Sequence, residues 1–226
     1  MLYAALYSTN SGAPRECCWV RQIGIPLSWL RAFLSAESGN VHRTFTLDAH
    51  LRRGVKVSIT TDASPYGLGA ILEIDGDIKG WLADRISSYD RRVLSMGQIA
   101  SSKDQQAAEA LAILVALREW APKWRDKRIR LQLRTDNVAA LATLIKLQPH
   151  SNSLGIIARE LALDVAMSTY SPDEAVHIPG LANKAADILS RLYQPEASTP
   201  LPPYLTADLQ HKCAERLPQW WRALPR

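Results

Sequence analysis

Two segments of the chain alternate strictly between apolar and polar residues. Residues 55–60 place Val or Ile at every odd position, and residues 129–134 place Ile or Leu at every odd position. Alternation with a period of two predicts a β-strand with one buried face. The first segment runs on to Asp62 and the second to Asp136. The pattern therefore predicts two strands that each end near a carboxylate.

A second and a third strand are expected directly after the first. Residues 68–74 and 78–83 are mostly apolar, and Asp75-Gly76 lies between the two runs. Asp-Gly favours the two-residue turn of a β-hairpin, because both residues accept positive φ angles. Three consecutive strands in a meander are the result.

Helices are expected between and after the strands. A long helix should run from Asp104, taken as its N-cap, to Trp120, because Pro122 cannot continue it. Asn137 is expected to cap a helix after the fourth strand. A helix, a short strand and a last helix are then expected at residues 152–167, 174–178 and 183–191. The predicted order of elements is βββαβααβα.

The patterned segment has flanks of a different character. Residues 1–50 contain a polar start and one helix expected after Pro26. Residues 194–226 hold 6 of the 13 prolines and a Trp-Trp pair, which is typical of a linker with a short docking element. We therefore expect one domain at residues 51–193, with an N-terminal flank at 1–50 and a C-terminal tail at 194–226.

Composition narrows the class of protein and its location. With 22% charged and 47% hydrophobic residues, the chain is not disordered, collagenous or a coiled coil. A net charge of +5 favours an anionic partner such as nucleic acid without requiring one. No apolar run reaches the length of a membrane span, and no basic signal region opens the chain, so no membrane association is expected. Cys17, Cys18 and Cys213 suit neither a disulfide framework nor a metal knuckle, which favours a reducing intracellular compartment, cytoplasm or nucleus.

Four carboxylates stand out from apolar surroundings. A helical crossover should return the fourth strand parallel to the first, so that Asp62 and Asp136 meet at the sheet edge where α/β proteins bind ligands. Glu109 is the only charged residue between residues 107 and 117, and Asp187 lies within a short apolar segment. The alternatives are that each strand-end Asp only begins a turn, that Glu109 faces solvent, and that Asp187 is an ordinary surface residue.

Carboxylates gathered at one site repel one another unless cations lie between them. Mg²⁺ fits such a site because it prefers oxygen ligands, and the sequence offers no convincing set of His or Cys ligands for zinc. A pair of Mg²⁺ ions would activate a water and stabilise the leaving oxygen of a phosphodiester. The residues alone thus indicate hydrolysis of nucleic acid.

Five short motifs follow one another in a fixed order. They are Thr-Asp-Ala-Ser at 61–64 with Gly-Leu-Gly-Ala at 67–70, Glu-Ala-Leu-Ala-Ile at 109–113, Thr-Asp-Asn at 135–137, His-Ile-Pro-Gly at 177–180 and Ala-Asp-Ile-Leu-Ser-Arg at 186–191. Together they resemble the ribonuclease H domain of retroelement reverse transcriptases, of the gypsy-like or DIRS-like kind. The resemblance covers about residues 55–193.

The resemblance implies a fold, an activity and partners. The implied fold is α/β and ribonuclease H-like, with a five-stranded mixed sheet of order 3-2-1-4-5 flanked by helices. The implied catalytic and metal-binding residues are Asp62, Glu109, Asp136 and Asp187, holding two Mg²⁺ ions for which Mn²⁺ can substitute. The implied reaction is endonucleolytic cleavage of the RNA strand of an RNA/DNA hybrid. The implied partners are that hybrid and a reverse transcriptase polymerase domain or integrase of the same element.

Two departures qualify the resemblance. Leu181 stands where many ribonucleases H carry a His after the Gly, and His177, four residues earlier, is expected to be structural. Activity should therefore be slower than in relatives that carry the His. The polymerase motif Tyr-x-Asp-Asp is missing, so the chain is not itself a reverse transcriptase. Residues 1–50 resemble the end of a polymerase or connection segment, and we expect a fragment or a separated remnant of a longer polyprotein.

Candidate substrate contacts lie near these acids and in a basic segment. Residues 118–134 carry seven Lys or Arg against two acids, with Trp120 and Trp124 interleaved. Such a segment suits a phosphate backbone, which makes Lys123 and Arg125 candidate contacts. The alternative is a solvated helix C-terminus, where cations are favoured in any case.

Amides and one hydroxyl complete the candidate substrate set. Gln105 and Gln106 match positions where the family often has amides that reach the minor groove, and an amide can pair with a 2′-hydroxyl. Ser64 and Asn137 follow two of the acids and are candidates for contact near the scissile bond. For Asn137 the alternative is a helix cap.

Two other functions compete with this hypothesis. One is a DNA-cutting integrase, transposase or resolvase relative, although such sites resemble Asp, Asp, Glu with the Glu on a late helix. The other is a decayed or domesticated module that binds a hybrid or a protein without cutting. The presence of all four acids favours an intact catalytic site.

Overall fold

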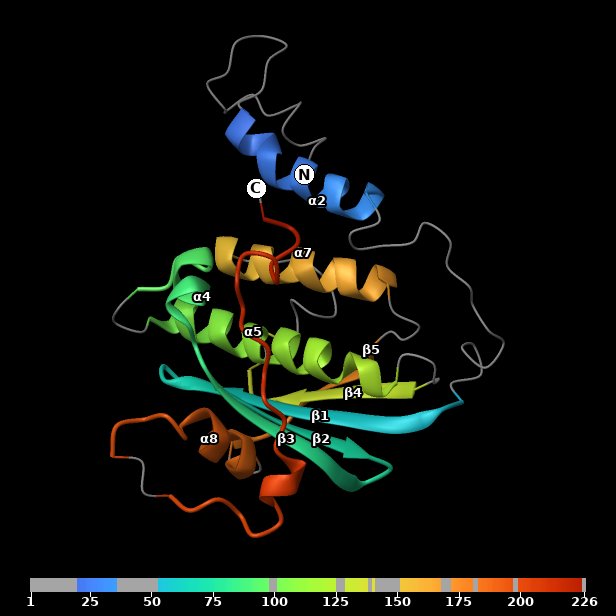
Figure 1. Cartoon of the computed structure of the whole chain (residues 1–226), viewed down its shortest axis with the longest axis vertical. Coiled ribbons are helices and arrows are strands. Elements are labelled where there is room, and N and C mark those ends of the chain that lie inside the picture. Colours follow the sequence, from blue (N-terminus) through green and yellow to red (C-terminus); the bar gives the residue numbers. More distant parts are fainter. Residues whose placement is uncertain are drawn as a thin grey trace.

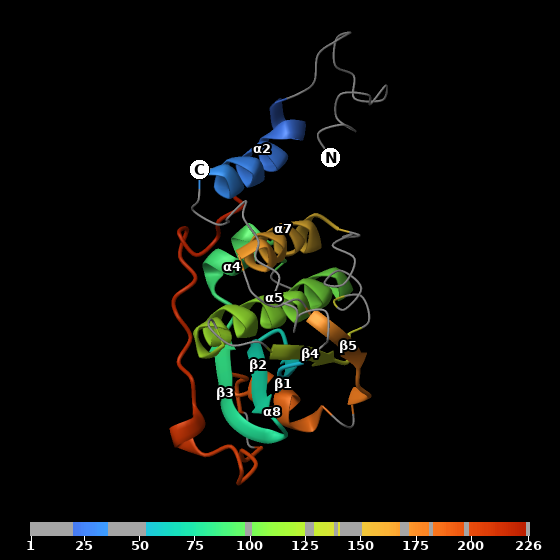
Figure 2. The same cartoon turned by 90° about the vertical axis from the view of Figure 1, so that its right-hand side faces the viewer.

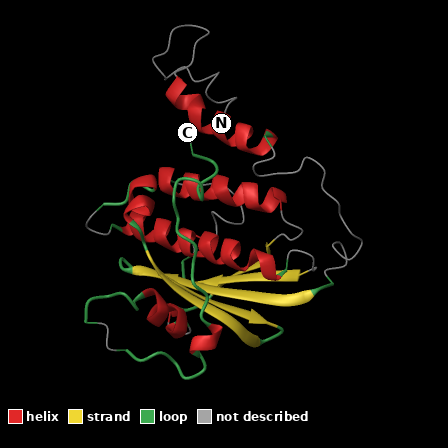
Figure 3. Cartoon of the chain, in the orientation of Figure 1, coloured by secondary structure: helices red, strands yellow, loops and turns green. Residues whose placement is uncertain are grey.

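The computed structural model describes residues 20–35, 53–97, 101–124, 129–137, 140, 151–167, 172–180, 183–196 and 199–224. A five-stranded sheet lies between helices in a layered arrangement (Figure 1, Figure 3). The long helix α5 (Ser102–Trp120) covers one face of the sheet, and the short helix α8 (Lys184–Ser190) covers part of the other. Helix α7 (Asn152–Met167) packs on α5, and helix α2 (Val20–Leu34) lies beyond α7.

The sheet has the order β3-β2-β1-β4-β5. Its strands are β1 (Val55–Ala63), β2 (Gly67–Ile74), β3 (Asp77–Arg85), β4 (Ile129–Thr135) and β5 (Pro172–His177). The first three form an antiparallel meander, whereas β4 pairs parallel to β1 and β5 parallel to β4. The mixed sheet and its predicted order are confirmed.

Alternation along β1 and β4 places their apolar residues in the main core. Val57, Ile59, Leu131 and Leu133 are almost fully buried and belong to one cluster with the apolar residues of α5. In the parallel register Thr60 pairs with Arg134, so continuing both strands by two residues brings Asp62 and Asp136 level. The two strands therefore deliver both carboxylates to one edge of the sheet.

The start of α5 differs from the prediction. Ser101, rather than Asp104, is the N-cap, and its hydroxyl accepts a hydrogen bond from the backbone N–H of Asp104. The Asp104 carboxylate accepts in return from the backbone N–H of Ser101 at 3.0 Å. This reciprocal pair is a capping box, in which the acid lies three residues after the N-cap.

The predicted range of helix α7, residues 152–167, is confirmed.

Two further helices differ from the prediction. Helix α2 runs through Pro26 instead of starting after it. Pro26 has no backbone N–H, so α2 lacks one helical hydrogen bond at this residue. Tertiary contacts offset this loss, because Trp29 donates from Nε1 to the Arg159 carbonyl at 3.0 Å and its ring stacks on Phe33. Helix α4 (Ser88–Val93) was not predicted, since its six residues are too few to show a helical period.

The C-terminal tail packs along the domain. It passes the β3 edge of the sheet and runs up beside α5 and α7 toward α2 (Figure 2). A single parallel bridge joins Trp81 of β3 to Gln210, and Trp221 is buried in the main core. The domain boundaries at residues 50 and 193 stay a prediction. Among the described residues, no helix combines the length and apolar character that crossing a membrane requires.

Candidate functional site

Three of the predicted acids converge at one edge of the sheet. Asp62 lies near the end of β1, Glu109 lies in α5, and Asp136 directly follows β4. One carboxylate oxygen from each lies within 4.8 Å of the others. We call these three residues the acid cluster. Its members are brought together by the parallel pairing of β1 with β4 and by the packing of α5 across the same strands.

Asp62 and Glu109 of the acid cluster are buried, whereas Asp136 is partly exposed, and burial changes the protonation of the first two. Asp62 is 5% exposed and Glu109 is 3% exposed. Desolvation raises the pKa of Asp62 from 3.8 to about 7, with repulsion from Asp136 and Asp187 adding to the rise and a Ser190 hydrogen bond opposing it. Desolvation and repulsion from Asp62 and Asp136 raise the pKa of Glu109 from 4.5 to about 9. Without a cation, the site favours protonated carboxyls.

The Glu109 carboxylate is only half satisfied. Gln105, one turn earlier in α5, donates from Nε2 to Glu109 Oε1 at 3.0 Å and to the Ala63 carbonyl at 2.6 Å. Glu109 Oε2 is buried and has no hydrogen-bond partner. A buried oxygen without a partner carries a desolvation cost that a bound cation would offset.

Asp187 lies apart from the acid cluster. Its carboxylate forms an ion pair with Arg191 one turn along α8, with Oδ1 at 2.6 Å from Nε, and 40% of its side chain is exposed. It is close enough to raise the pKa of Asp62 by repulsion. Its predicted role as a metal ligand stays a prediction.

The donor chemistry of the acid cluster fits a hard divalent cation. The three residues offer carboxylate oxygens, which Mg²⁺ and Mn²⁺ prefer, and within the described part of the chain no Lys or Arg forms an ion pair with them. Oε2 of Glu109, which accepts no hydrogen bond, is available as a metal ligand. The site can therefore hold a divalent metal ion.

Residues of the last loop and helix also border the site. His177 Nε2 lies 3.0 Å from the Asp136 carbonyl oxygen. A Cβ at Gly180 would lie 3.4 Å from Asp136 Oδ2, so this glycine leaves the carboxylate uncovered. Asn183 and Ser190 both contact Asp62. The sequence motif at 186–191 contains Ser190 but gave it no role, and Asn183 gave no signal, because a lone Asn before a helix is common. Leu181 lies outside the described residues.

The candidate substrate residues have different surroundings. Ser64 is 1% exposed, and its hydroxyl donates to the Ser190 carbonyl at 2.7 Å, so this geometry gives no support to a substrate contact. Asn137 accepts from the Ala140 N–H at 2.9 Å, as a helix cap does. Gln105 is engaged with Glu109, whereas Gln106 is half-buried with no such bond to the acid cluster.

The described part of the basic segment divides between the interior and the surface. Its two tryptophans are buried and Arg118 nearly so, Lys123 and Arg130 are exposed, and residues 125–128 lie outside the described residues. Arg118 pairs with Glu160 and lies with 8% of its side chain exposed. Trp120 and Trp124 are buried in the main core because they face the sheet and tail rather than solvent. Arg134 pairs with Glu73 at 2.9 Å.

Two predicted phosphate contacts remain from this segment. Lys123 is exposed in the 3₁₀ turn Ala121–Lys123. Arg125 lies outside the described residues. Their contact with substrate stays a prediction.

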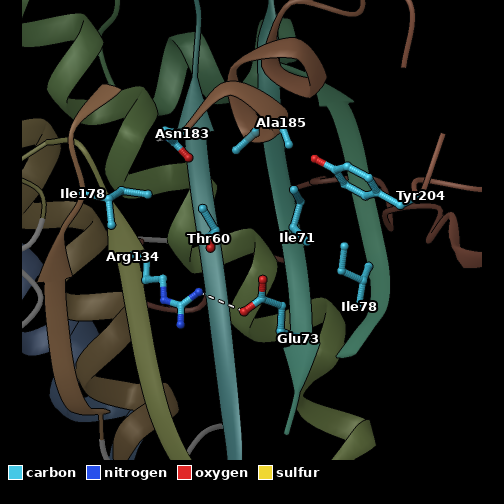
Figure 4. Close-up of a pocket in the computed structure, with 10 residues that line it drawn as sticks. Thr60, Ile71, Glu73, Ile78, Arg134, Ile178, Asn183, Ala185 and Tyr204 are labelled. Carbon is cyan, nitrogen blue, oxygen red and sulfur yellow. Dashed lines mark hydrogen bonds and ion pairs between the residues drawn. The ribbon is translucent and has the colours of Figure 1, made fainter. Parts of the chain in front are cut away.

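A cavity of about 470 Å³ opens on the sheet face that α8 leaves uncovered. Figure 4 shows the Arg134–Glu73 ion pair at one end and Asn183 and Ala185 at the other, with Tyr204 at the side. Apolar Ile71, from β2, forms part of its wall. The cavity therefore lies beside the start of α8, and Asn183, which contacts Asp62, is part of its lining.

Comparisons with known proteins give matches among solved structures only. No family model and no curated protein matches the chain. RNase H1 from the halophilic archaeon Halobacterium salinarum is 21% identical with a TM-score of 0.42, covering 59% of this chain and 93% of its own. LC11-RNase H1 isolated from compost is 17% identical with a TM-score of 0.43, covering 62% and 94%. The N-terminal RNase H domain of a Mycobacterium tuberculosis protein is 15% identical with a TM-score of 0.43, covering 60% and 95%.

Proposed function

We propose that this protein is a metal-dependent endoribonuclease that hydrolyses the RNA strand of RNA/DNA hybrids. The observation that carries the proposal is the acid cluster, in which three carboxylates from separate elements, two of them buried, have oxygens within 4.8 Å of one another. Such an arrangement is costly to fold unless a cation neutralises it. The cluster lies at the strand ends where α/β sheets bind their ligands.

The acid cluster would hold two Mg²⁺ ions together with Asp187, and Mn²⁺ could replace them. When bound, the ions supply an activated water and stabilise the leaving oxygen of the phosphodiester. Gln105 keeps one oxygen of Glu109 engaged, so the other oxygen would be free to bind an ion. Burial of Asp62 and Glu109 lowers the local dielectric, which would strengthen their attraction for a cation, while the partly exposed Asp136 leaves the site open to solvent.

Selectivity for RNA and the biological setting rest on the motif resemblance. The half-buried Gln106 is the amide best placed to reach a 2′-hydroxyl, because the neighbouring Gln105 is already engaged. The proposed setting is the ribonuclease H part of a retrotransposon reverse transcriptase, with the polymerase domain or integrase of the same element as partner.

The test is a cleavage assay with the purified full-length chain. An end-labelled RNA/DNA hybrid is incubated in parallel with duplex DNA and duplex RNA, each with Mg²⁺, Mn²⁺ or EDTA. Metal-dependent cutting of the hybrid's RNA strand alone is expected. Binding without cutting would favour a non-catalytic module instead, and cutting of duplex DNA would favour a DNA-cutting relative.

A further inference from the structure

Both oxygens of the Asp62 carboxylate accept hydrogen bonds from residues at the ends of α8. Ser190, the last residue of the helix, has Oγ at 2.7 Å from Asp62 Oδ2. Asn183, the residue before the helix, has Nδ2 at 3.3 Å from Asp62 Oδ1 and at 3.0 Å from the Thr61 carbonyl oxygen. Ser190 and Asn183 are 0% and 2% exposed, so neither side chain can reach a substrate.

The close approach of α8 to the sheet depends on Gly69 in β2. A Cβ at that position would lie 2.4 Å from the Ala186 carbonyl oxygen and 2.6 Å from the Ser190 nitrogen. Backbone atoms cannot yield at such distances, so a side chain there would push α8 outward. The hydroxyl of Ser64 then fixes the end of the helix by donating to the Ser190 carbonyl at 2.7 Å. These contacts set where the Ser190 hydroxyl lies.

The Ser190 hydroxyl has one proton and two acceptors. Its Oγ lies 2.7 Å from Asp62 Oδ2 and 2.9 Å from the Asp187 carbonyl oxygen. The charged carboxylate is the stronger acceptor and takes the proton. Each carboxylate oxygen has two lone pairs, so the hydrogen bond fixes the orientation of Asp62 and leaves lone pairs for a cation.

We propose that Ser190, assisted by Asn183, is a positioning residue that holds the Asp62 carboxylate in the orientation required to bind the divalent cation. Helix α8 thus has two functions at the site, because it carries Asp187 and also orients a ligand on β1. This inference rests on the proposed function, and it adds a dependence of metal affinity on a side chain that touches neither metal nor substrate.

The test compares Mn²⁺ binding by full-length variants, measured as the electron paramagnetic resonance signal of unbound Mn²⁺, with Mg²⁺ as competitor. Ser190→Ala should weaken Mn²⁺ binding by about 10- to 100-fold, the usual effect of losing a partner behind a metal ligand. Ser190→Thr keeps the hydroxyl and should bind close to wild type. Ser153→Ala removes a hydroxyl that donates to the Leu94 carbonyl away from the site, and should leave binding unchanged.

Thermal unfolding and steady-state kinetics complete the experiment. If Ser190 had a purely structural role, Ser190→Ala would lower the melting temperature, and the folded variant would bind Mn²⁺ as tightly as wild type. With positioning, kcat for hybrid cleavage falls while KM for the hybrid is unchanged. If Ser190→Ala does not fold, Asn183→Ala should show a smaller loss of affinity in the same direction.

The outcomes separate this inference from the proposed function. Equal Mn²⁺ affinity in wild type and folded Ser190→Ala would overturn the positioning role while leaving the nuclease proposal intact. A folded Ser190→Thr variant that binds Mn²⁺ as weakly as Ser190→Ala would also overturn the positioning role. A wild-type chain that binds no Mn²⁺ and cuts no hybrid would overturn the proposed function itself.

Discussion

The protein buries carboxylates in two different ways. In the interface between α5 and α7, Glu160 is fully buried and Asp164 nearly so, and Arg118 pairs with both at 2.7 Å. In the acid cluster, Asp62 and Glu109 are nearly as buried as Glu160 and lie beside the partly exposed Asp136. These carboxylates repel one another, and no Arg or Lys of the described residues pairs with them. Arg118 neutralises the carboxylates between α5 and α7, whereas the described residues supply no cation to the acid cluster.

A second internally neutralised site shows that the chain readily supplies cations elsewhere. Arg216 of the tail, with 3% of its side chain exposed, pairs with Asp90 at 2.9 Å and with Asp84. It also donates to the Arg85 carbonyl at 2.6 Å. An Arg brought in from 126 residues away neutralises Asp90, whereas no Lys or Arg of the described residues pairs with Asp62 or Glu109. The difference indicates that the acid cluster is kept for ligand binding and not for stability.

The largest expected effect is on catalysis at the unneutralised site. Asp136→Asn removes one metal ligand and should lower hybrid cleavage by about 10³-fold or more, since metal-held groups supply several kcal/mol of transition-state stabilisation. Hybrid binding should persist in a gel-shift assay. Asp77→Asn, at an exposed hairpin position, is the control and should cut at the parental rate. If Asp136→Asn cut the hybrid at the parental rate, the assignment of the acid cluster as the catalytic site would be wrong.

The next effect is on stability at a neutralised site. Arg216→Met leaves Asp90 buried without its cation and should cost about 3–5 kcal/mol in the free energy of unfolding. Urea denaturation measures this cost. The matched control is Lys79→Met, which breaks an exposed pair with Asp77 and should change stability by about 1 kcal/mol or less. Similar small costs for both variants would mean that the tail contact contributes little.

The opposite sign is expected when charge is removed from the acid cluster. Glu109→Gln should raise the free energy of unfolding of the metal-free chain at pH 8 by about 1–3 kcal/mol, because Glu109, with its pKa raised to about 9, must take up a proton when the chain folds at this pH, whereas Gln is neutral in both states. Urea denaturation with EDTA present measures the change. A loss of stability would mean that Glu109 is already satisfied in the folded chain without metal.

The pH dependence of the metal-free chain should be a smaller effect of the same origin. The folded-state pKa values of Asp62 and Glu109 are raised to about 7 and about 9, from ordinary values of 3.8 and 4.5. The folded chain therefore binds more protons than the unfolded chain between these limits, and stability falls as the pH rises. Melting temperatures in EDTA should decrease from about pH 5 to about pH 9, and less steeply in Glu109→Gln. An increase over that range would contradict the assigned direction.

Much of the sheet could be predicted because its signals are local. The alternation in β1 and β4 and the Asp-Gly turn define strands from neighbouring residues alone, and the right-handed crossover then places β4 beside β1. The full strand order, including β5 at the edge, was implied by the motif resemblance. The convergence of Asp62 with Asp136 followed from the same reasoning. Glu109 was identified because an acid in an apolar helix needs a partner.

Contacts between distant parts of the chain gave no sequence signal. The pairing of Arg216 with Asp84 spans 132 residues, and a proline-rich tail has no periodicity to indicate that it packs. Arg118 seemed to belong to a basic surface because charge composition cannot distinguish a solvated Arg from one that faces acids on another helix. The contact of Ser190 with Asp62 depends on how closely α8 approaches Gly69, which only the packed structure reveals.

The central claim is that the acid cluster binds divalent metal. Its most direct test is a crystal of the full-length chain grown with Mn²⁺, with anomalous diffraction recorded at the manganese absorption edge. We expect an anomalous peak within ligand distance of oxygens from Asp62, Glu109 and Asp136. A map with no peak there, in a protein that keeps the three carboxylates together, would contradict the account.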